Sequence, residues 1–153
     1  MKLETTVLAK ESIINDEGVK NEVYTCTENY KTVGIGHKCL KGEPEYNLKV
    51  GSKISHVRVQ ELFNEDFDRT VEDCIDLFGD DWADYAPDIQ IVLTNMCFQL
   101  GKKGLSKFKK MRAALDAKNY KEMAAQMKQS KWYGQTTNRA DRLIAIVSGL
   151  DDG

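Results

Sequence analysis

Apolar positions along the chain recur mostly at helical spacing. In the segment 55–78, apolar residues return at intervals of three and four, with acidic residues between them. These apolar positions are Val59, Leu62, Phe63, Phe67, Val71, Cys74, Ile75 and Phe78. The periodicity predicts one long amphipathic helix.

A second apolar stripe is broad enough to predict the most buried helix of the protein. Its positions are Ile89, Val92, Leu93, Met96, Cys97 and Leu100. The glycine-containing run 101–104 is expected to end this helix. Shorter helices are predicted around three further apolar groups. They are Phe108, Met111 and Leu115; Tyr120, Met123, Ala124 and Met127; and Leu143, Ile144 and Val147.

The N-terminal segment predicts a helix that ends at a candidate catalytic acid. Its apolar positions are Leu3, Val7, Leu8 and Ile14, and it closes at Glu17-Gly18. The carboxyl end of a helix carries partial negative charge, so Glu17 should keep a proton more readily than free glutamate unless a cation lies nearby. A protonated carboxyl near neutral pH is a usable general acid.

A β-hairpin is predicted directly after this acid. Segments 23–26 and 30–34 are rich in β-branched and aromatic residues, and 27–29 supplies the turn. Cys26 and Thr32 lie near the two ends of the hairpin, so folding brings both toward the acid. One carboxylic acid facing side chains that hold water indicates sugar hydrolysis.

These elements predict an α+β fold that is mainly helical, in a single domain over residues 1–153. We expect a hairpin lobe at about 13–54, a linking helix at about 55–78 and a helical lobe at about 79–150 that also includes the N-terminal helix. The chain has 41% hydrophobic residues, enough for a substantial core, and no Pro/Gly/Ser-rich linker divides it.

Three blocks of sequence, in order, resemble the phage-type lysozymes and especially those of the T-even phages. The blocks are Glu17-x8-Cys26-x5-Thr32 with Thr32-Val33-Gly34-Ile35-Gly36-His37, Asn95-Met96-Cys97-Phe98-Gln99-Leu100-Gly101, and Trp132-Tyr133-Gly134-Gln135-Thr136-Thr137-Asn138-Arg139-Ala140. The similarity extends over about residues 13–150. It is weakest at 40–53, where the chain is expected to be shorter and to lack a small helix.

The resemblance implies a lysozyme-like fold and hydrolysis of the β-1,4 bond between N-acetylmuramic acid and N-acetylglucosamine in bacterial peptidoglycan, with inversion. By the same resemblance, Glu17 is the general acid and Thr32 helps to hold the attacking water. Cys26 stands where the family usually has aspartate. No cofactor or metal is implied.

Cys26 changes the expected chemistry of the water-holding pair. A free thiol has a pKa of about 8.5, so it is mostly neutral at pH 7, and a neighbouring acid should keep it more so. As a minor thiolate it would accept a proton from the attacking water. We therefore expect Cys26 and Thr32 to position that water together.

Several further residues are assigned supporting positions by the resemblance. It places Arg139 near Glu17 and Arg142 near Asp16, and it makes Phe98, Gln99, Gln126 and Trp132 candidates for the wall of the cleft. For Phe98 and Trp132, core packing is an equally good interpretation. His37 is expected to pair with Asp66 as a structural contact.

Charge and cysteine content limit the partners. The net charge is −2 with an isoelectric point near 5.7, so no basic footprint for nucleic acid is present. The lysines at 102, 103, 107, 109 and 110 form a local basic cluster, which we expect to be a solvated face rather than a site of attraction for anionic polymers. The four cysteines lack metal-site spacing and fit free thiols in a reducing cytoplasm.

Residues 1–6 show no signal peptide or membrane anchor. The resemblance therefore implies synthesis in the cytoplasm of an infected bacterium and release through holin lesions to the periplasmic cell wall. We expect a monomer with no stable membrane binding.

Three other functions remain open. A non-hydrolytic peptidoglycan-binding lysis protein would follow if cysteine in place of aspartate abolishes hydrolysis. A cysteine hydrolase using Cys26 and His37 leaves Glu17 and Thr32 unexplained. A lytic transglycosylase needs the acid but no attacking water, and Thr32 argues mildly against it.

Overall fold

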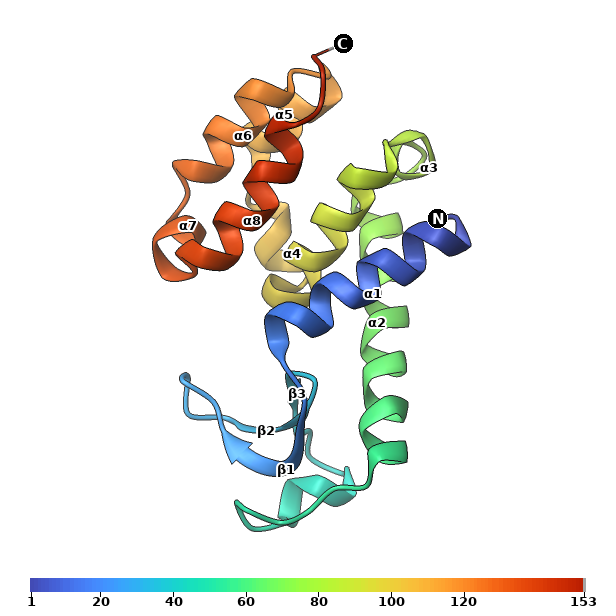
Figure 1. Ribbon diagram of the computed structural model, residues 1–153, viewed down its shortest axis with the longest axis vertical. Helices are drawn as coiled ribbons and strands as arrows, with labels where there is room; N and C mark the ends of the chain where they lie inside the picture. Colours follow the sequence, from blue (N-terminus) through green and yellow to red (C-terminus); the bar gives the residue numbers. More distant parts are fainter. Residues whose placement is uncertain (153) are drawn as a thin grey trace.

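The computed structural model describes residues 1–152 and has two lobes joined by one long helix (Figure 1). That helix, α2, runs from His56 to Phe78. It begins where predicted because the Ser55 hydroxyl accepts a hydrogen bond from the Arg58 N–H, which satisfies a free donor of the first turn. The predicted mainly helical α+β, lysozyme-like fold is confirmed.

The smaller lobe contains a three-stranded antiparallel sheet in the order β1-β2-β3. Strand β1 is Lys20–Thr25, β2 is Lys31–Gly34 and β3 is His37–Lys38. The predicted hairpin is therefore present, with Asn29 at positive φ in its turn. The third strand was not predicted, because two residues are too few for a periodic pattern. A 3₁₀ turn at Pro44–Asn47 also occupies the region expected to lack a small helix.

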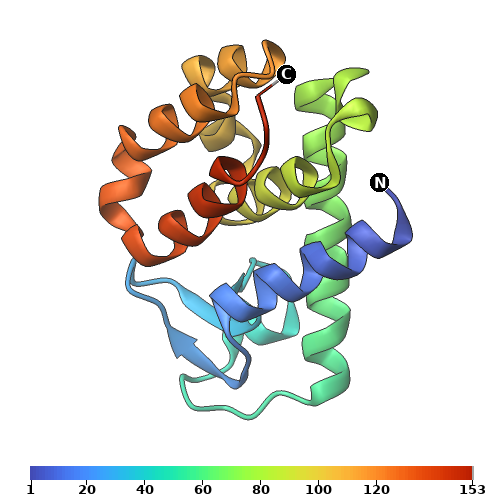
Figure 2. The ribbon, with the colours of Figure 1, turned by 45° about the horizontal axis from the view of Figure 1, so that its top comes forward.

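The larger lobe is helical, and the N-terminal helix α1, Leu3–Glu17, crosses beside its helix α4 (Figures 1 and 2). The buried residues Ala9 and Ile13 of α1 belong to the core that includes Val33 and Phe67. The other helices are α3, Asp81–Asp84; α4, Pro87–Ser106; α5, Lys109–Asp116; α6, Tyr120–Lys128; α7, Lys131–Gln135; and α8, Thr137–Ser148. Helical geometry in α4 breaks at Gly101, where φ is 77°, and resumes to Ser106. The expected helix end is thus a kink followed by one more helical segment.

Each lobe has its own hydrophobic core. In the larger core, Cys74, Met96, Met123 and Met127 are fully buried among residues of α2, α4 and α6, and the smaller one includes Val33, Ile35 and Phe67. The predicted buried faces of two helices, α2 and α1, are wrong in part. Ile75 of α2 is 48% exposed.

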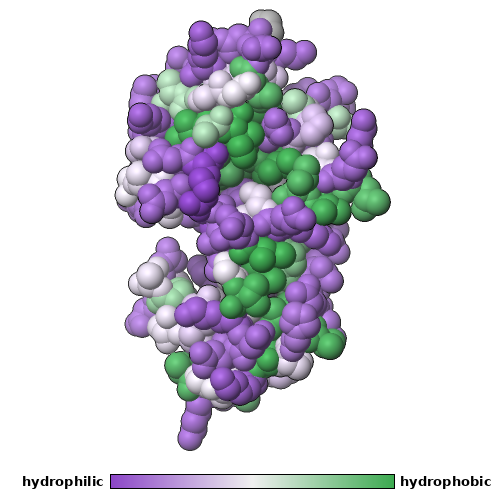
Figure 3. Space-filling view, in the orientation of Figure 1, coloured by the Kyte–Doolittle hydropathy of each residue, from purple (hydrophilic) through white to green (hydrophobic). Residues whose placement is uncertain are grey.

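The buried face of α1 differs from the face that its large apolar residues predict. Thr5, Ala9 and Ile13 are buried there, whereas Leu3 is 80% exposed. Apolar surface is accordingly visible near the start of this helix (Figure 3). The buried face thus combines one large apolar residue, Ile13, with the smaller Thr5 and Ala9. None of the helices within residues 1–152 is both long and apolar enough to span a bilayer.

Candidate active site

The predicted catalytic residues line one pocket of about 540 Å³ where the two lobes meet. Glu17 at the end of α1, Cys26 and Thr32 of the hairpin, Phe98 and Gln99 of α4, and Arg139 of α8 all contribute to its wall. Figure 3 shows a notch between the lobes on the left of the view. Residues far apart in the sequence therefore converge on this single pocket.

Glu17 is fixed in the pocket by a cation from the other end of the chain. Gly18, at a φ of 74°, turns the chain out of α1 and donates its N–H to the Ile14 carbonyl at 2.8 Å. The Glu17 carboxylate accepts a hydrogen bond from Arg139 Nη1 at 2.6 Å and remains 20% exposed. Arg139 thus lies beside the acid, as the resemblance implied.

The buried side-chain amide of Asn95 holds the Arg139 guanidinium in place. Asn95 Oδ1 accepts a hydrogen bond from Arg139 Nε at 2.9 Å, and Asn95 Nδ2 donates to Asp16 and to Ser12, each at 2.9 Å. Arg142 completes this group by pairing with Asp16, as expected. Asn95 is fully buried, so its hydrogen bonds set the direction of the guanidinium with little freedom. Its motif was noted in the sequence, but this role was not anticipated.

Gly36 provides the space into which the Glu17 carboxyl packs. A Cβ atom built on Gly36 would lie 2.5 Å from Glu17 Oε1 and 3.0 Å from its Cδ. The φ of Gly36 is 64°, in the left-handed region that glycine adopts at little cost. Arg139 from one side and the bare backbone of Gly36 from the other therefore define where the acid lies.

Cys26 and Thr32 face the same pocket from the hairpin. The Tyr30 carbonyl accepts hydrogen bonds from the Cys26 N–H at 2.9 Å and from the Thr32 hydroxyl at 3.0 Å, which ties the two residues together. Hydrogen bonding from the Tyr30 backbone is the largest influence and lowers the pKa of the Cys26 thiol, with smaller help from the Glu28 backbone and the Thr32 side chain. The expectation of a thiol held more neutral is therefore wrong, because the turn hydrogen bonds outweigh desolvation and nearby negative charge.

Tyr24 also lines the pocket and was missed from the sequence. Burial raises the pKa of its hydroxyl, and the charges of Glu17 and Cys26 raise it further. Its ring also lies under the ammonium of Lys20, at 4.6 Å. In the sequence, Tyr24 is one of the aromatic residues of the predicted hairpin, and strand propensity alone does not single it out.

His37 forms a buried polar cluster at the edge of the pocket. Its Nδ1 lies 2.6 Å from Asp66 Oδ2, and its Nε2 lies 2.9 Å from Glu43 Oε1. Burial of His37 favours the neutral ring, but the hydrogen bonds to Asp66 and Glu43 outweigh it and raise the pKa. Arg69 in turn donates to Asp66 at 2.7 Å. Glu43 was not anticipated, because it lies in an irregular loop without a periodic signal.

Two predicted wall residues lie beside the pocket instead of in it. Gln126 and Trp132 line a neighbouring groove of the helical lobe. Trp132 is only 3% exposed, and its Nε1 donates to Gln99 Oε1 at 2.9 Å. Trp132 is thus a core residue that also supports a wall residue of the pocket.

Comparison with known proteins identifies the family. The family model described as Phage lysozyme matches residues 15–145. The chain belongs to the phage lysozyme family. It is therefore a lysozyme-type glycoside hydrolase, as the sequence blocks indicated.

The relatives of this phage lysozyme include both stand-alone and larger proteins. It is 32% identical over 156 residues to probable T4-type lysozyme 2 of Dictyostelium discoideum, covering 90% of this chain and 91% of that protein. It is 31% identical over 154 residues to the pre-baseplate central spike protein Gp5 of Enterobacteria phage T4, covering 90% of this chain but 27% of that protein. It is 28% identical over 128 residues to peptidoglycan hydrolase gp36 of Pseudomonas phage phiKMV, covering 84% of this chain and 14% of that protein.

Proposed function

We propose that this phage lysozyme is a muramidase that hydrolyses the β-1,4 bond between N-acetylmuramic acid and N-acetylglucosamine with inversion. The observation that carries the proposal is the placement of Glu17, paired with Arg139, in the same pocket as Cys26 and Thr32. A pocket of about 540 Å³ has room for sugar rings, and its mixed polar and apolar wall suits them.

Glu17 acts in this scheme as the general acid that protonates the departing glycosidic oxygen. Arg139 stabilises the carboxylate that remains after the proton has left, because the pair at 2.6 Å is only 11% exposed on the arginine side. Asn95 keeps the guanidinium aimed at the acid through the bond at 2.9 Å. Most of this machinery serves to hold one carboxyl group in position.

Cys26 and Thr32 act on the water that attacks the opposite face of the sugar. Since hydrogen bonding lowers the pKa of Cys26, a larger fraction of it is thiolate near neutral pH than for a free cysteine, and thiolate is the form that accepts a proton. General-base assistance is typically worth about 10² to 10⁴ in rate. The departure from aspartate is therefore compatible with hydrolysis.

The test is mass analysis of fragments released from purified peptidoglycan by wild type, Glu17→Gln and Cys26→Ala. We expect new reducing ends from wild type, almost none from Glu17→Gln and a loss of at least tens-fold for Cys26→Ala. Product stereochemistry is followed in parallel. Inverted anomers support the water route, whereas retained anomers would overturn it in favour of a covalent bond to Cys26.

The remaining alternatives give distinct products in the same experiment. Anhydro-muramic ends would replace hydrolysis with lytic transglycosylation. Binding of peptidoglycan without any release of fragments would mean a non-hydrolytic wall-binding protein. Fragments that persist unchanged in Glu17→Gln would remove the acid from the mechanism altogether.

We further infer a role in host lysis, in which holin lesions give access to the periplasmic wall. Only the phage origin of relatives such as gp36 and Gp5 supports this setting. The spike protein favours a second setting, in which a lysozyme unit works within a larger assembly. Expression in bacteria separates the two routes of access. Lysis that depends on co-expressed holin supports the first, and lysis that is independent of any membrane lesion contradicts it.

A further inference from the structure

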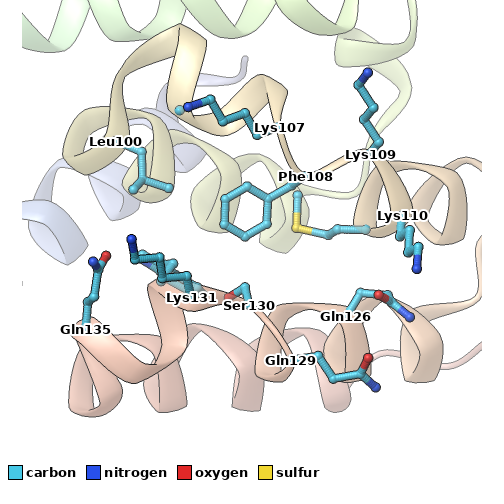
Figure 4. A pocket seen from close by; sticks show the side chains of 13 residues that line it. Leu100, Lys107, Phe108, Lys109, Lys110, Gln126, Gln129, Ser130, Lys131 and Gln135 are labelled. Carbon is cyan, nitrogen blue, oxygen red and sulfur yellow. The ribbon is translucent and has the colours of Figure 1, made fainter.

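A second groove, of about 650 Å³, lies next to the catalytic pocket in the helical lobe. Figure 4 shows its two walls, with the end of α4 and the start of α5 on one side and α6 and α7 on the other. Leu100 lines both this groove and the catalytic pocket. The Trp132–Gln99 hydrogen bond joins the two walls where they meet. A ligand in the pocket can therefore extend into the groove.

The groove combines an apolar floor with a cationic rim. Met111 and Trp132 are 2% and 3% exposed and form part of the floor. The rim carries four exposed lysines, Lys107, Lys109, Lys110 and Lys131, and no aspartate or glutamate lines the groove. This local surface contrasts with a net charge of −2 for the whole chain. Such a lining complements a ligand that has both small apolar groups and carboxylates.

The lysines are not equivalent in position. Lys107 and Lys131 come from opposite walls at the end where Leu100 lies, as Figure 4 shows. Lys110 lies toward Gln126 at the other end, and Lys109 points away from the α6–α7 wall (Figure 4). Among the four groove lysines, Lys107 and Lys131 are therefore the two at the Leu100 end, which borders the catalytic pocket.

We propose that Lys107 and Lys131 make this lysozyme selective for glycan strands whose peptide branches carry free carboxylates instead of amides. The proposal rests on the proposed function, because it concerns the same substrate. Each muramic acid of peptidoglycan bears a short peptide made largely of small apolar residues and carboxylates. Because Leu100 lines both the pocket and the groove, a glycan bound in the pocket would bring such a branch to the end of the groove where Lys107 and Lys131 lie.

The size of the effect follows from exposure. Lys107 and Lys131 are both exposed, so each contact with a carboxylate is a surface ion pair and contributes modestly. Two such contacts correspond to a preference of about three- to thirty-fold for carboxylate over amide branches. Added salt reduces this preference, because exposed charges are screened over about 10 Å at 0.1 M ionic strength.

The experiment measures kcat/KM on three matched substrates. These are glycan strands with free-carboxyl peptides, the same strands after carbodiimide coupling to ammonia, and strands stripped of peptide by an amidase. We expect wild type to favour the free-carboxyl strands over the amidated ones by three- to thirty-fold. The double variant Lys107→Gln/Lys131→Gln should lose that ratio, and Lys107→Glu/Lys131→Glu should reverse it.

A double variant at Lys118 and Lys128, both changed to glutamine, is the matched control. It removes the same charge from exposed positions of the same lobe outside the groove, so it should keep the wild-type ratio. Thermal unfolding checks that all variants fold.

The outcomes distinguish this inference from the proposed function. Equal wild-type rates on free and amidated strands, or a ratio that the control loses equally, would overturn the charge selection while leaving the hydrolysis intact. If wild type releases no reducing ends even from peptide-free glycan, the proposed function itself fails. Charge selection that survives Lys107→Gln/Lys131→Gln would mean that other residues provide it.

Discussion

Substitution of Gly36 by alanine tests whether the exact place of the acid matters more than the stability of the fold. The added Cβ would lie 2.5 Å from Glu17 Oε1, whereas ordinary contact begins at 3.4 Å. The carboxyl must therefore retreat by about 0.9 Å. Because this carboxyl is the end of a flexible side chain, the fold loses little when it moves. The pair with Arg139 at 2.6 Å, however, cannot keep its geometry.

The two effects of Gly36→Ala differ in size. A left-handed backbone costs a residue with a side chain about 1–2 kcal/mol of stability. A misplacement of about 1 Å at a reacting group can lower the rate about 10²-fold, which corresponds to about 2.7 kcal/mol in the barrier. We therefore expect a modest fall in melting temperature together with a loss of about 10²-fold in kcat.

Gly79→Ala is the matched control for this prediction. Gly79 has a φ of 61°, close to the 64° of Gly36, but a Cβ there would meet nothing within 4 Å. Gly79→Ala should therefore lose the same stability from its left-handed backbone, but without any contact with Glu17. Both proteins are compared by thermal unfolding and by initial rates on peptidoglycan. Refutation would come from a Gly36→Ala enzyme whose rate per folded molecule matches that of Gly79→Ala.

Three further predictions follow from the same contacts. Two carboxylates raise the pKa of buried His37, so the contribution of His37 to folding stability is present in full below about pH 6.5 and is lost as pH rises through the raised pKa. His37→Asn should therefore cost about 2–4 kcal/mol of unfolding free energy at pH 5 and clearly less at pH 9. Equal losses at both pH values in denaturant titrations would contradict this assignment. Iodoacetamide at pH 7 should label Cys26 before Cys39, because hydrogen bonding lowers the pKa of the first thiol and burial raises that of the second; peptide mapping decides, and prior labelling of Cys39 would refute the order. Asn95→Ala leaves the Asp16 carboxylate, whose side chain is 3% exposed, without one donor and should cost about 1–3 kcal/mol in the same titrations, and a change within experimental error would disprove this.

The helices could be predicted from the sequence wherever one face of the helix is buried and the opposite face is exposed to solvent. Helix α2 has a polar cap at Ser55 and a strong 3.6-residue pattern, so its start and most of its core-facing side follow, with Ile75 as an exception. Helix α1 shows the limit of the same reasoning. Its buried positions are Thr5, Ala9 and Ile13, whereas Leu3 is exposed, so the pattern of large apolar residues indicates a helix but not its buried face.

The candidate site could be predicted only through the resemblance of whole motifs. Glu17 and Arg139 are separated by 122 positions, and no local pattern connects them. Their pairing depends on how α1 and α8 pack around Asn95, which periodicity does not encode. Glu43 and Gly36 carried even less signal, because one acts from an irregular loop and the other acts by having no side chain.

The thiol at position 26 shows why composition alone gives the wrong sign for a pKa. A count of neighbouring charges predicts a thiol held neutral, because acids lie around the site. The turn between β1 and β2 reverses this prediction, since hydrogen bonding from the Tyr30 backbone stabilises the thiolate. A separate hydrogen bond at 2.9 Å, from the Cys26 N–H to the Tyr30 carbonyl, closes the hairpin with Asn29 in the left-handed region and so keeps the Tyr30 backbone beside Cys26. The same turn that places Cys26 in the pocket therefore also lowers the pKa of its thiol, which is the property that the proposed water-activating role requires.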